Sequence, residues 1–134
     1  REGSAGPEVL LQLRGDVAYM ARHWAAAAAG HVERGETAVD AARREAAEEL
    51  SLNAVDLEFE FSMQRTQRAD PIDERIDFFF TARSWSGEPR IAEPDKCAEI
   101  GWFRLDDLPT PLVPHEAFAL SRLGCGERYL SFGF

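Results

Sequence analysis

Residues 43–50 read "RREAAEEL", an alanine-rich segment that contains three glutamates. Residues three and four positions apart are neighbours on a helix, so Glu45 faces Glu48 and Glu49 and the three carboxylates share one patch. Like charges at these spacings destabilise a helix, and the helix dipole disfavours negative charge in its last turns. No Lys or Arg follows in residues 50–53 to relieve the repulsion. The pattern therefore indicates a bound cation, and Mg²⁺ prefers carboxylate oxygens together with substrate phosphates.

The segment that carries these glutamates has the pattern of a helix. Thr37 is positioned to cap the first turn, and Asp40 follows three residues later, as in a capping box. Apolar positions recur at steps of three, four and four, at Val39, Ala42, Ala46 and Leu50. The sequence predicts a helix over residues 38–50, whose small side chains allow it to pack closely on a sheet.

Strand patterns lie on both sides of this helix, at residues 8–14, 57–63, 76–82 and 99–105. The second and third of these segments fit an antiparallel pair joined by residues 64–75. Residues 115–123 have the spacing of a closing helix that stops at Gly124, and the alanine run at residues 25–29 fits either helix or loop. The sum predicts an α/β fold, in which a mixed sheet has helices on its faces.

The length and charge of the chain limit what it can bind. The sequence has 134 residues, which suits one domain, 1–134, and a formal net charge of −9. The negative field argues against binding a nucleic acid polymer, and no apolar run approaches the roughly 20 residues of a membrane span. Residues 1–7 lack the order of a signal peptide, and Cys97 and Cys125 lack metal or disulfide spacing. We therefore expect a cytoplasmic protein with two free thiols.

A longer pattern around the three glutamates resembles the signature of the Nudix hydrolases. That signature is glycine, five residues, glutamate, seven residues, Arg-Glu-aliphatic, one residue, Glu-Glu, one residue and Gly-aliphatic. The chain matches eight of these nine defined positions from Gly30 to Leu52, with Ala46 as the first aliphatic residue. A match of this length at fixed spacing is highly specific. Residues 93–109, "EPDKCAEIGWFRLDDLP", are similar to the branch that contains the MutT-like nucleoside triphosphate diphosphatases.

The resemblance implies the Nudix α/β/α sandwich, with a mixed β-sheet between helices and with the family's first strand placed before residue 1. Two features depart from the family. Ser51 stands where the family has glycine, at a helix end that favours a left-handed backbone, so we expect a reshaped or strained exit from the helix. Five alanines separate Trp24 from Gly30 where relatives have a short segment with a proline, so the loop that lines the substrate is expected to differ.

The resemblance also implies a role for each residue that matches the signature. The implied metal ligands are Glu45, Glu48, Glu49 and the backbone carbonyl of Gly30. Glu36 and Arg44 would form a salt bridge that orients the carboxylates. Either Glu45 or Glu48 would accept the proton of the attacking water.

Further candidates lie outside the signature. In some members of the family a carboxylate from a later loop joins the metal shell or acts as a base, and Glu93 and Glu99 are both candidates here. Substrate-binding candidates are Trp24, Phe80 and Glu93. Phe78 and Phe80 share one face of a strand, where packing in the core is the commoner role, and packing is also the commoner role for Trp24.

The resemblance implies a Mg²⁺-dependent enzyme, with Mn²⁺ as a substitute, that hydrolyses a nucleoside diphosphate linked to a group X. The leading expectation is a (d)NTP that gives NMP and pyrophosphate, and the alternatives are ADP-ribose, an isoprenyl diphosphate or another diphosphate. A rival of another class is a Nudix-like module that senses a nucleotide without cleaving it. Its usual mark is loss of a signature glutamate, and all of these are present. The expected partner is a small-molecule nucleotide or other diphosphate, and homodimers are common among relatives.

Overall fold

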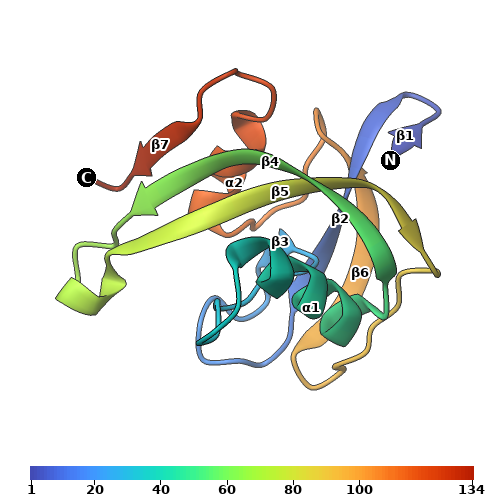
Figure 1. The fold of residues 1–134 in the computed structure, drawn as a ribbon, viewed down its shortest axis with the longest axis horizontal. Helices are drawn as coiled ribbons and strands as arrows, with labels where there is room; N and C mark the ends of the chain where they lie inside the picture. Colours follow the sequence, from blue (N-terminus) through green and yellow to red (C-terminus); the bar gives the residue numbers. More distant parts are fainter.

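The computed structural model describes residues 1–134 and contains two sheets and two α-helices (Figure 1). The first sheet consists of β1 (Glu2–Gly3), β2 (Gly6–Arg14), β3 (Trp24–Ala26) and β6 (Cys97–Arg104). The second consists of β4 (Asn53–Arg65), β5 (Arg75–Ser86) and β7 (Tyr129–Phe132). The helices are α1 (Ala38–Leu50) and α2 (Pro114–Ser121), and a short 3₁₀ helix, η1 (Pro71–Asp73), lies between β4 and β5.

The strands divide differently from the single mixed sheet that the sequence predicts. In the first sheet, β2 pairs antiparallel with β3 along one edge and with β6 along the other, so that Leu11 lies opposite both Ala26 and Gly101. Both edges of β2 are therefore occupied, and β2 is not available to β4. In the second sheet, β4 pairs antiparallel with β5 and parallel with β7. The second sheet alone is mixed, and the predicted α/β class is confirmed.

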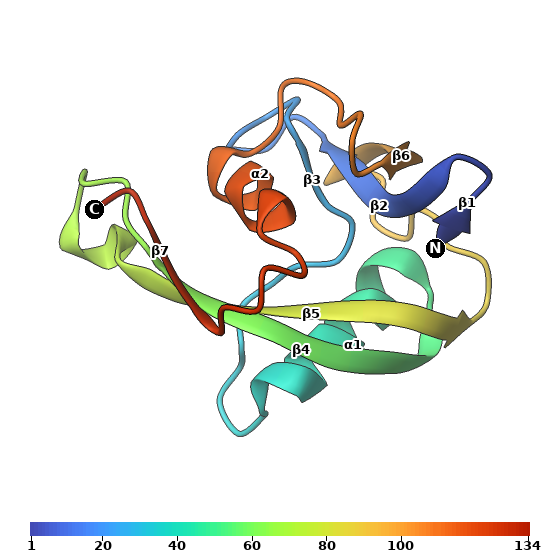
Figure 2. The ribbon, with the colours of Figure 1, turned by 90° about the horizontal axis from the view of Figure 1, so that it is seen from above.

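Each helix packs on its own part of the core. Ala46 and Leu50 of α1 meet Ala27, Leu52 and Val55 in one buried cluster. A second buried cluster joins α2 to the second sheet and consists of Phe61, Met63, Ala119 and Leu130. In Figure 2, α2 lies beside β3 and above β4 and β5. Helix α2 therefore brings residues near the end of the chain close to strands from its first two thirds.

The structure confirms the predicted helix over residues 38–50. The Thr37 side chain accepts a hydrogen bond from the Asp40 backbone N–H at 3.2 Å, which satisfies one of the free donors of the first turn. The buried side of the helix contains Ala41, Ala46 and Leu50. Neither α1 nor α2 has the length and apolar character that crossing a membrane requires.

The alanine run and β7 show where local pattern was insufficient. Trp24–Ala26 form β3, and Ala25 and Ala27 are buried, because pairing with β2 outweighs the helix propensity of alanine. Tyr129–Phe132 form β7, a strand that the sequence analysis did not predict. This strand is short, and its partner β4 lies more than sixty residues earlier in the chain.

The hairpin of β4 and β5 is longer than predicted, and its register shifts between Phe59 and Phe61. The shift places Phe61 in the core, whereas Phe59 is 39% exposed. Phe78 is 50% exposed, so the prediction that it packs in the core is wrong. It lies opposite Ser62, on the face away from the neighbouring Phe79, which packs against Phe61.

Candidate active site

Arg44, in the middle of α1, connects the helix to the β3–α1 loop (residues 27–37). Its guanidinium donates to the Glu36 carboxylate at 2.8 and 3.1 Å, to Glu45 at 2.7 Å and to Glu48 at 3.2 Å. The same group donates to the backbone carbonyl of His31 at 3.0 Å. One side chain therefore fixes both the loop and two of the three clustered carboxylates of α1.

The hydrogen bonds of this network shift the pKa values of Glu36 and Arg44 so that both side chains stay charged. Hydrogen bonds from Arg44, and then one from the backbone N–H of Glu33, lower the pKa of Glu36. Hydrogen bonds to Glu36 and Glu45 raise the pKa of Arg44. Both members of the Glu36–Arg44 salt bridge are therefore charged at any pH near neutrality, and the loop stays attached to the helix over that range.

Gly30 lies against the Glu45 side chain. A Cβ atom at position 30 would overlap the Glu45 carboxylate, so no larger residue fits without moving that carboxylate. The Glu45 side chain is 13% exposed, whereas that of Glu48 is 55% exposed. The Gly30 backbone therefore lies directly beside the Glu45 carboxylate.

Glu49 is half-buried at the end of the cluster nearest the last turn of α1. Its carboxylate accepts a hydrogen bond from the Ala29 backbone N–H at 2.9 Å. Burial, with the nearby Glu45 and Glu93 carboxylates adding to it, raises the pKa of Glu49 to about 7. A bound cation favours the ionised form, so cation binding and loss of this proton are expected to be coupled.

Of the two later carboxylates, Glu93 lies near the cluster. The backbone N–H of Ala92 donates to the Glu49 carbonyl at 3.1 Å, which brings the loop before β6 onto the end of α1. Glu93 forms an ion pair with Lys96 at 2.9 Å. Glu99 is exposed on β6, opposite Leu13. The structure therefore brings Glu93 to the cluster through a contact that Glu99 lacks.

Glu36, Glu45, Glu48 and Glu49, with Arg44, form what we call the acidic patch. Its carboxylate oxygens suit a hard cation such as Mg²⁺, and the Gly30 backbone lies beside one of these carboxylates. No three acidic side chains converge on one point, because Glu45 and Glu48 turn to Arg44 and Glu49 turns to Ala29. A cation that binds here must compete with Arg44 for the same oxygens.

The two aromatic candidates for substrate binding both pack on other rings. Trp24 contacts Phe103 edge-on, with ring centroids 4.8 Å apart, and its backbone pairs with the segment around Leu112. Phe80 contacts Phe59 at 5.6 Å on the second sheet. Both rings therefore pack on neighbouring aromatic rings, and their role in substrate binding stays a prediction.

Ser51 adopts the left-handed conformation that the glycine of the signature favours, with φ 59° and ψ 33°. Its N–H donates to the carbonyl of Ala47 at 3.0 Å, and the N–H of Leu52 donates to that of Ala46 at 3.2 Å. These bonds close the helix as a Schellman-type end. The chain therefore leaves the helix through a left-handed residue, as the signature favours. The Cβ atom of serine makes this conformation less favourable than it would be for glycine.

A second group of polar side chains lies between the sheets and was not found from the sequence. This buried polar cluster consists of Gln12, Arg65, Asp77, His115 and Glu116. Arg65 and Asp77 form an ion pair across β4 and β5, and His115 lies 3.9 Å from the same carboxylate. The only sequence signal was the pair His115-Glu116 at the start of an otherwise apolar helix.

Burial drives both titratable residues of α2 toward their neutral forms. Glu116 is 9% exposed, accepts a hydrogen bond from the Ala26 N–H at 3.2 Å, and burial raises its pKa to about 7. Burial, followed by the positive charge of Arg65, lowers the pKa of His115 to about 4. A small cavity of about 100 Å³ borders this cluster, lined by Tyr19, Met20, Arg65, Thr66, Gln67, Pro114, His115 and Phe132.

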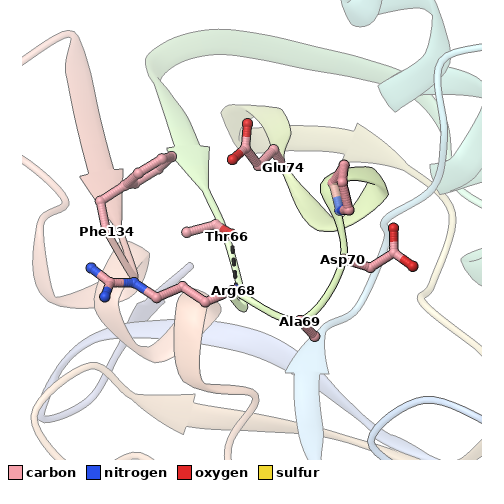
Figure 3. A pocket seen from close by; sticks show the side chains of 7 residues that line it. Thr66, Arg68, Ala69, Asp70, Glu74 and Phe134 are labelled. Atoms are coloured by element: carbon pink, nitrogen blue, oxygen red, sulfur yellow. Dashed lines mark hydrogen bonds between the residues drawn. The ribbon is translucent and has the colours of Figure 1, made fainter.

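A larger and more open cavity, of about 450 Å³, lies at the far end of the β4–β5 hairpin (Figure 3). Arg68 and Phe134 lie on one side of it, and Asp70 and Glu74 lie around the rest of its rim. Arg68 is held by its own bond to the Gly133 carbonyl at 2.8 Å. None of the residues predicted for the site lines this cavity.

Comparison with known proteins agrees with this geometry. The NUDIX domain family matches residues 2–123. A curated relative, the NAD-capped RNA hydrolase NudC of Citrobacter koseri, is 35% identical over 95 residues, which is 71% of this chain. The matched part is 34% of that relative, so the chain spans about a third of its length.

Solved structures show the same relationship. A MutT NUDIX hydrolase from Burkholderia pseudomallei superposes with a TM-score of 0.77 at 32% identity, covering 85% of this chain and 86% of that one. A mutator MutT protein from Bacillus halodurans superposes with a TM-score of 0.67 at 23% identity, covering 93% and 78% of the respective chains. At 23% identity, the match to the Bacillus halodurans protein shows only that the two chains share a fold.

Proposed function

The chain belongs to the NUDIX domain family, and from this premise we propose that it is a Mg²⁺-dependent pyrophosphohydrolase whose active site is the acidic patch of α1. The observation that carries the proposal is the Arg44 network. A single guanidinium, itself tied to Glu36, orients Glu45 and Glu48 beside the glycine of the β3–α1 loop. Such fixed orientation of metal-binding carboxylates is what a phosphoryl-transfer site requires.

The residues have distinct roles in the proposed reaction. Glu45, Glu48, Glu49 and the Gly30 carbonyl hold Mg²⁺, which when bound neutralises the diphosphate and lowers the pKa of a water. Water attacks phosphorus, the anhydride P–O bond breaks, and a carboxylate of the Glu45–Glu48 pair takes the proton. Glu36 and Arg44 keep that pair in place, and Glu93 reaches the site from the loop before β6.

The proposed substrate is a small-molecule nucleotide, most simply a (d)NTP that is converted to NMP and pyrophosphate. The 32% identity with the MutT NUDIX hydrolase supports this choice over isoprenyl diphosphates. The neutral, buried His115 beside a cavity also supports it, because a neutral imidazole offers one donor and one acceptor to a heteroaromatic ring.

A dinucleotide joined through a diphosphate, such as NAD or ADP-ribose, is the second candidate. It is favoured by the 35% identity with a relative named for NAD-capped RNA. Both candidates use the same acidic patch and differ in the group that lies beyond the diphosphate. They are therefore separated by their products and not by their metal dependence.

The test is chromatographic separation of the products formed from a panel of (d)NTPs, NAD, ADP-ribose, NAD-capped RNA and isoprenyl diphosphates, with Mg²⁺, with Mn²⁺ and with EDTA. A (d)NTP would give NMP and pyrophosphate, whereas NAD and ADP-ribose would each give two monophosphates. We expect metal-dependent turnover of a nucleotide, lost in Glu48→Gln and retained in Glu58→Gln, a control at an exposed glutamate of β4. Binding of nucleotide without turnover of any compound would refute the hydrolase and support a sensor instead.

A further inference from the structure

Arg75, the first residue of β5, contacts the β3–α1 loop directly. Its Nη1 lies 3.2 Å from Nε2 of His31, the residue that follows Gly30. The carbonyl of the same histidine accepts the hydrogen bond from Arg44. Figure 2 shows the loop crossing β5 in the first part of that strand. A single residue, His31, therefore separates the guanidinium of Arg75 from the network of the acidic patch.

Arg75 differs from the neighbouring cations because no carboxylate lies within 4 Å of it. Arg44 pairs with four carboxylates, and Lys96 pairs with Glu93. Arg65, which lies opposite Arg75 across the hairpin, pairs with Asp77. The only side-chain hydrogen bond of Arg75 is the one to the His31 ring, which leaves most of its N–H donors free.

We propose that Arg75 binds a phosphate of the substrate beside the acidic patch. This inference rests on the proposed function, because it concerns the same diphosphate. A site built from carboxylates repels an anionic substrate wherever the metal does not cover them, so a cation at its border lowers that cost. A guanidinium fork matches phosphate oxygens in a bidentate manner, and Arg75 is half-buried, which limits screening by solvent.

The position of Arg75 also fits a substrate that extends from the acidic patch toward α2. Arg75 lies opposite Arg65 on the hairpin, and Arg65 lines the small cavity near His115. His31 contacts Arg75, and Arg75 is in turn the strand neighbour of the residue that lines the cavity. A diphosphate on the acidic patch with its nucleoside in the direction of the cavity would place a phosphate within reach of this guanidinium.

A purely structural role gives a different expectation. If Arg75 serves only to anchor the loop through His31, removal of either partner has the same effect. If Arg75 binds phosphate, its removal weakens binding while removal of the His31 ring does not. His31 is exposed, so His31→Ala leaves no buried gap. The two variants therefore separate direct binding from positioning.

The experiment compares wild type with Arg75→Ala, Arg75→Lys, His31→Ala and, as a control on the same strand, Arg83→Ala, which removes an exposed arginine. Calorimetry measures binding of methylenediphosphonate, a non-hydrolysable diphosphate, in Mg²⁺, and KM and kcat are measured for the best substrate of the panel. We expect Arg75→Ala to weaken binding and raise KM roughly 10- to 100-fold, as for loss of a charge-assisted pair. Arg75→Lys should recover part of this loss, because lysine keeps the charge without the guanidinium fork. The kcat of the Arg75 variants should change by less than about threefold. In His31→Ala and Arg83→Ala, binding, KM and kcat should all change by less than about threefold.

Two results would overturn the assignment. One is binding by Arg75→Ala that equals wild type, and the other is an equal loss in His31→Ala and Arg75→Ala. Circular dichroism establishes that each variant is folded, and the conservative Arg75→Lys variant provides the comparison if the alanine variant is not. Absence of any wild-type turnover refutes the proposed function along with this inference, whereas wild-type turnover with an unchanged Arg75→Ala variant refutes only the role of Arg75.

Discussion

The acidic patch of α1 and the buried polar cluster near α2 both gather ionisable residues, but a fixed guanidinium organises the first, whereas burial governs the second. In the acidic patch, hydrogen bonds of 2.8 and 3.1 Å from Arg44 lower the pKa of Glu36, and burial raises the pKa of Glu49 alone, to about 7. In the buried polar cluster, burial drives Glu116 and His115 toward their neutral forms. The acidic patch therefore provides charge to bind a cation, whereas the cluster provides neutral hydrogen-bonding groups.

The two regions also differ in how the chain builds them. Every residue of the acidic patch lies within residues 30–50, on one loop and one helix. The buried polar cluster takes residues from β2, β4, β5 and α2, and its first and last members are more than a hundred residues apart. A helix fixes neighbours at three and four positions, so the first arrangement can be read from spacing. The second exists only once the sheets and α2 have packed together.

The largest expected effect is that of Glu48→Gln, which removes one charge from the acidic patch. The variant keeps the shape of the side chain but loses a metal ligand or the proton acceptor. We expect kcat to fall by roughly 10²- to 10⁴-fold. Because Glu48 is 55% exposed, the free energy of unfolding should hardly change. Turnover and urea denaturation measure the two quantities, with Glu58→Gln on β4 as the control. Activity of Glu48→Gln close to wild type would contradict the assignment.

Glu116→Gln tests whether burial controls the protonation of the buried polar cluster. The folded-state pKa of about 7 lies above the ordinary value of 4.5, so the stability associated with protonated Glu116 is present below pH 4.5 and is lost as pH rises through 7. Glutamine stays neutral and can still accept the Ala26 N–H. We expect the variant to exceed wild type in free energy of unfolding by up to about 3 kcal/mol at pH 8, with the difference vanishing toward pH 4.5.

Urea denaturation from pH 4.5 to pH 8 measures this difference. The matched control is Glu58→Gln, at an exposed position of β4, which should show no such pH dependence. A difference that is constant across the range would mean that burial does not hold Glu116 neutral, and the contrast between the two regions would be lost.

Arg44→Lys probes the connection within the acidic patch. Lysine keeps the charge, but it cannot bridge Glu36, Glu45 and the His31 carbonyl at once. We expect kcat/KM to fall roughly 10- to 100-fold, as for loss of a residue that orients metal ligands. The affinity for Mg²⁺, measured by calorimetry, should fall as well. Arg43→Lys, at the exposed neighbouring position, is the control, and equal behaviour of the two variants would argue against the network.

The smallest expected effect is that of Ser51→Gly at the end of α1. Ser51 has a φ of 59°, a conformation that costs a residue with a Cβ roughly 1 kcal/mol relative to glycine. We expect the variant to gain about that much in free energy of unfolding, with kcat unchanged. Ala47→Gly, at an exposed position inside the same helix, should instead lose about 1 kcal/mol. Destabilisation by both substitutions would show that Ser51 is not strained.

Local pattern was sufficient for α1, because its cap at Thr37 and its apolar spacing specify the helix within one segment. It was also sufficient for the central parts of β4 and β5. It failed for the alanine run, where pairing of β3 with β2 overrode helix propensity, and for β7, whose partner is distant in sequence. It also failed for Phe78, because the uninterrupted apolar run of residues 78–80 does not show which face of β5 turns to the core.

The sequence by itself determined the family, the α/β class and the grouping of Glu45, Glu48 and Glu49, since helical periodicity converts spacing directly into proximity. Only the tertiary structure decided which distant residues meet that group. It brought Glu93 to Glu49, placed Arg75 against His31, and buried Glu116 beside β3. These contacts depend on how sheets and loops pack across long sequence separations, and no local periodicity encodes that packing.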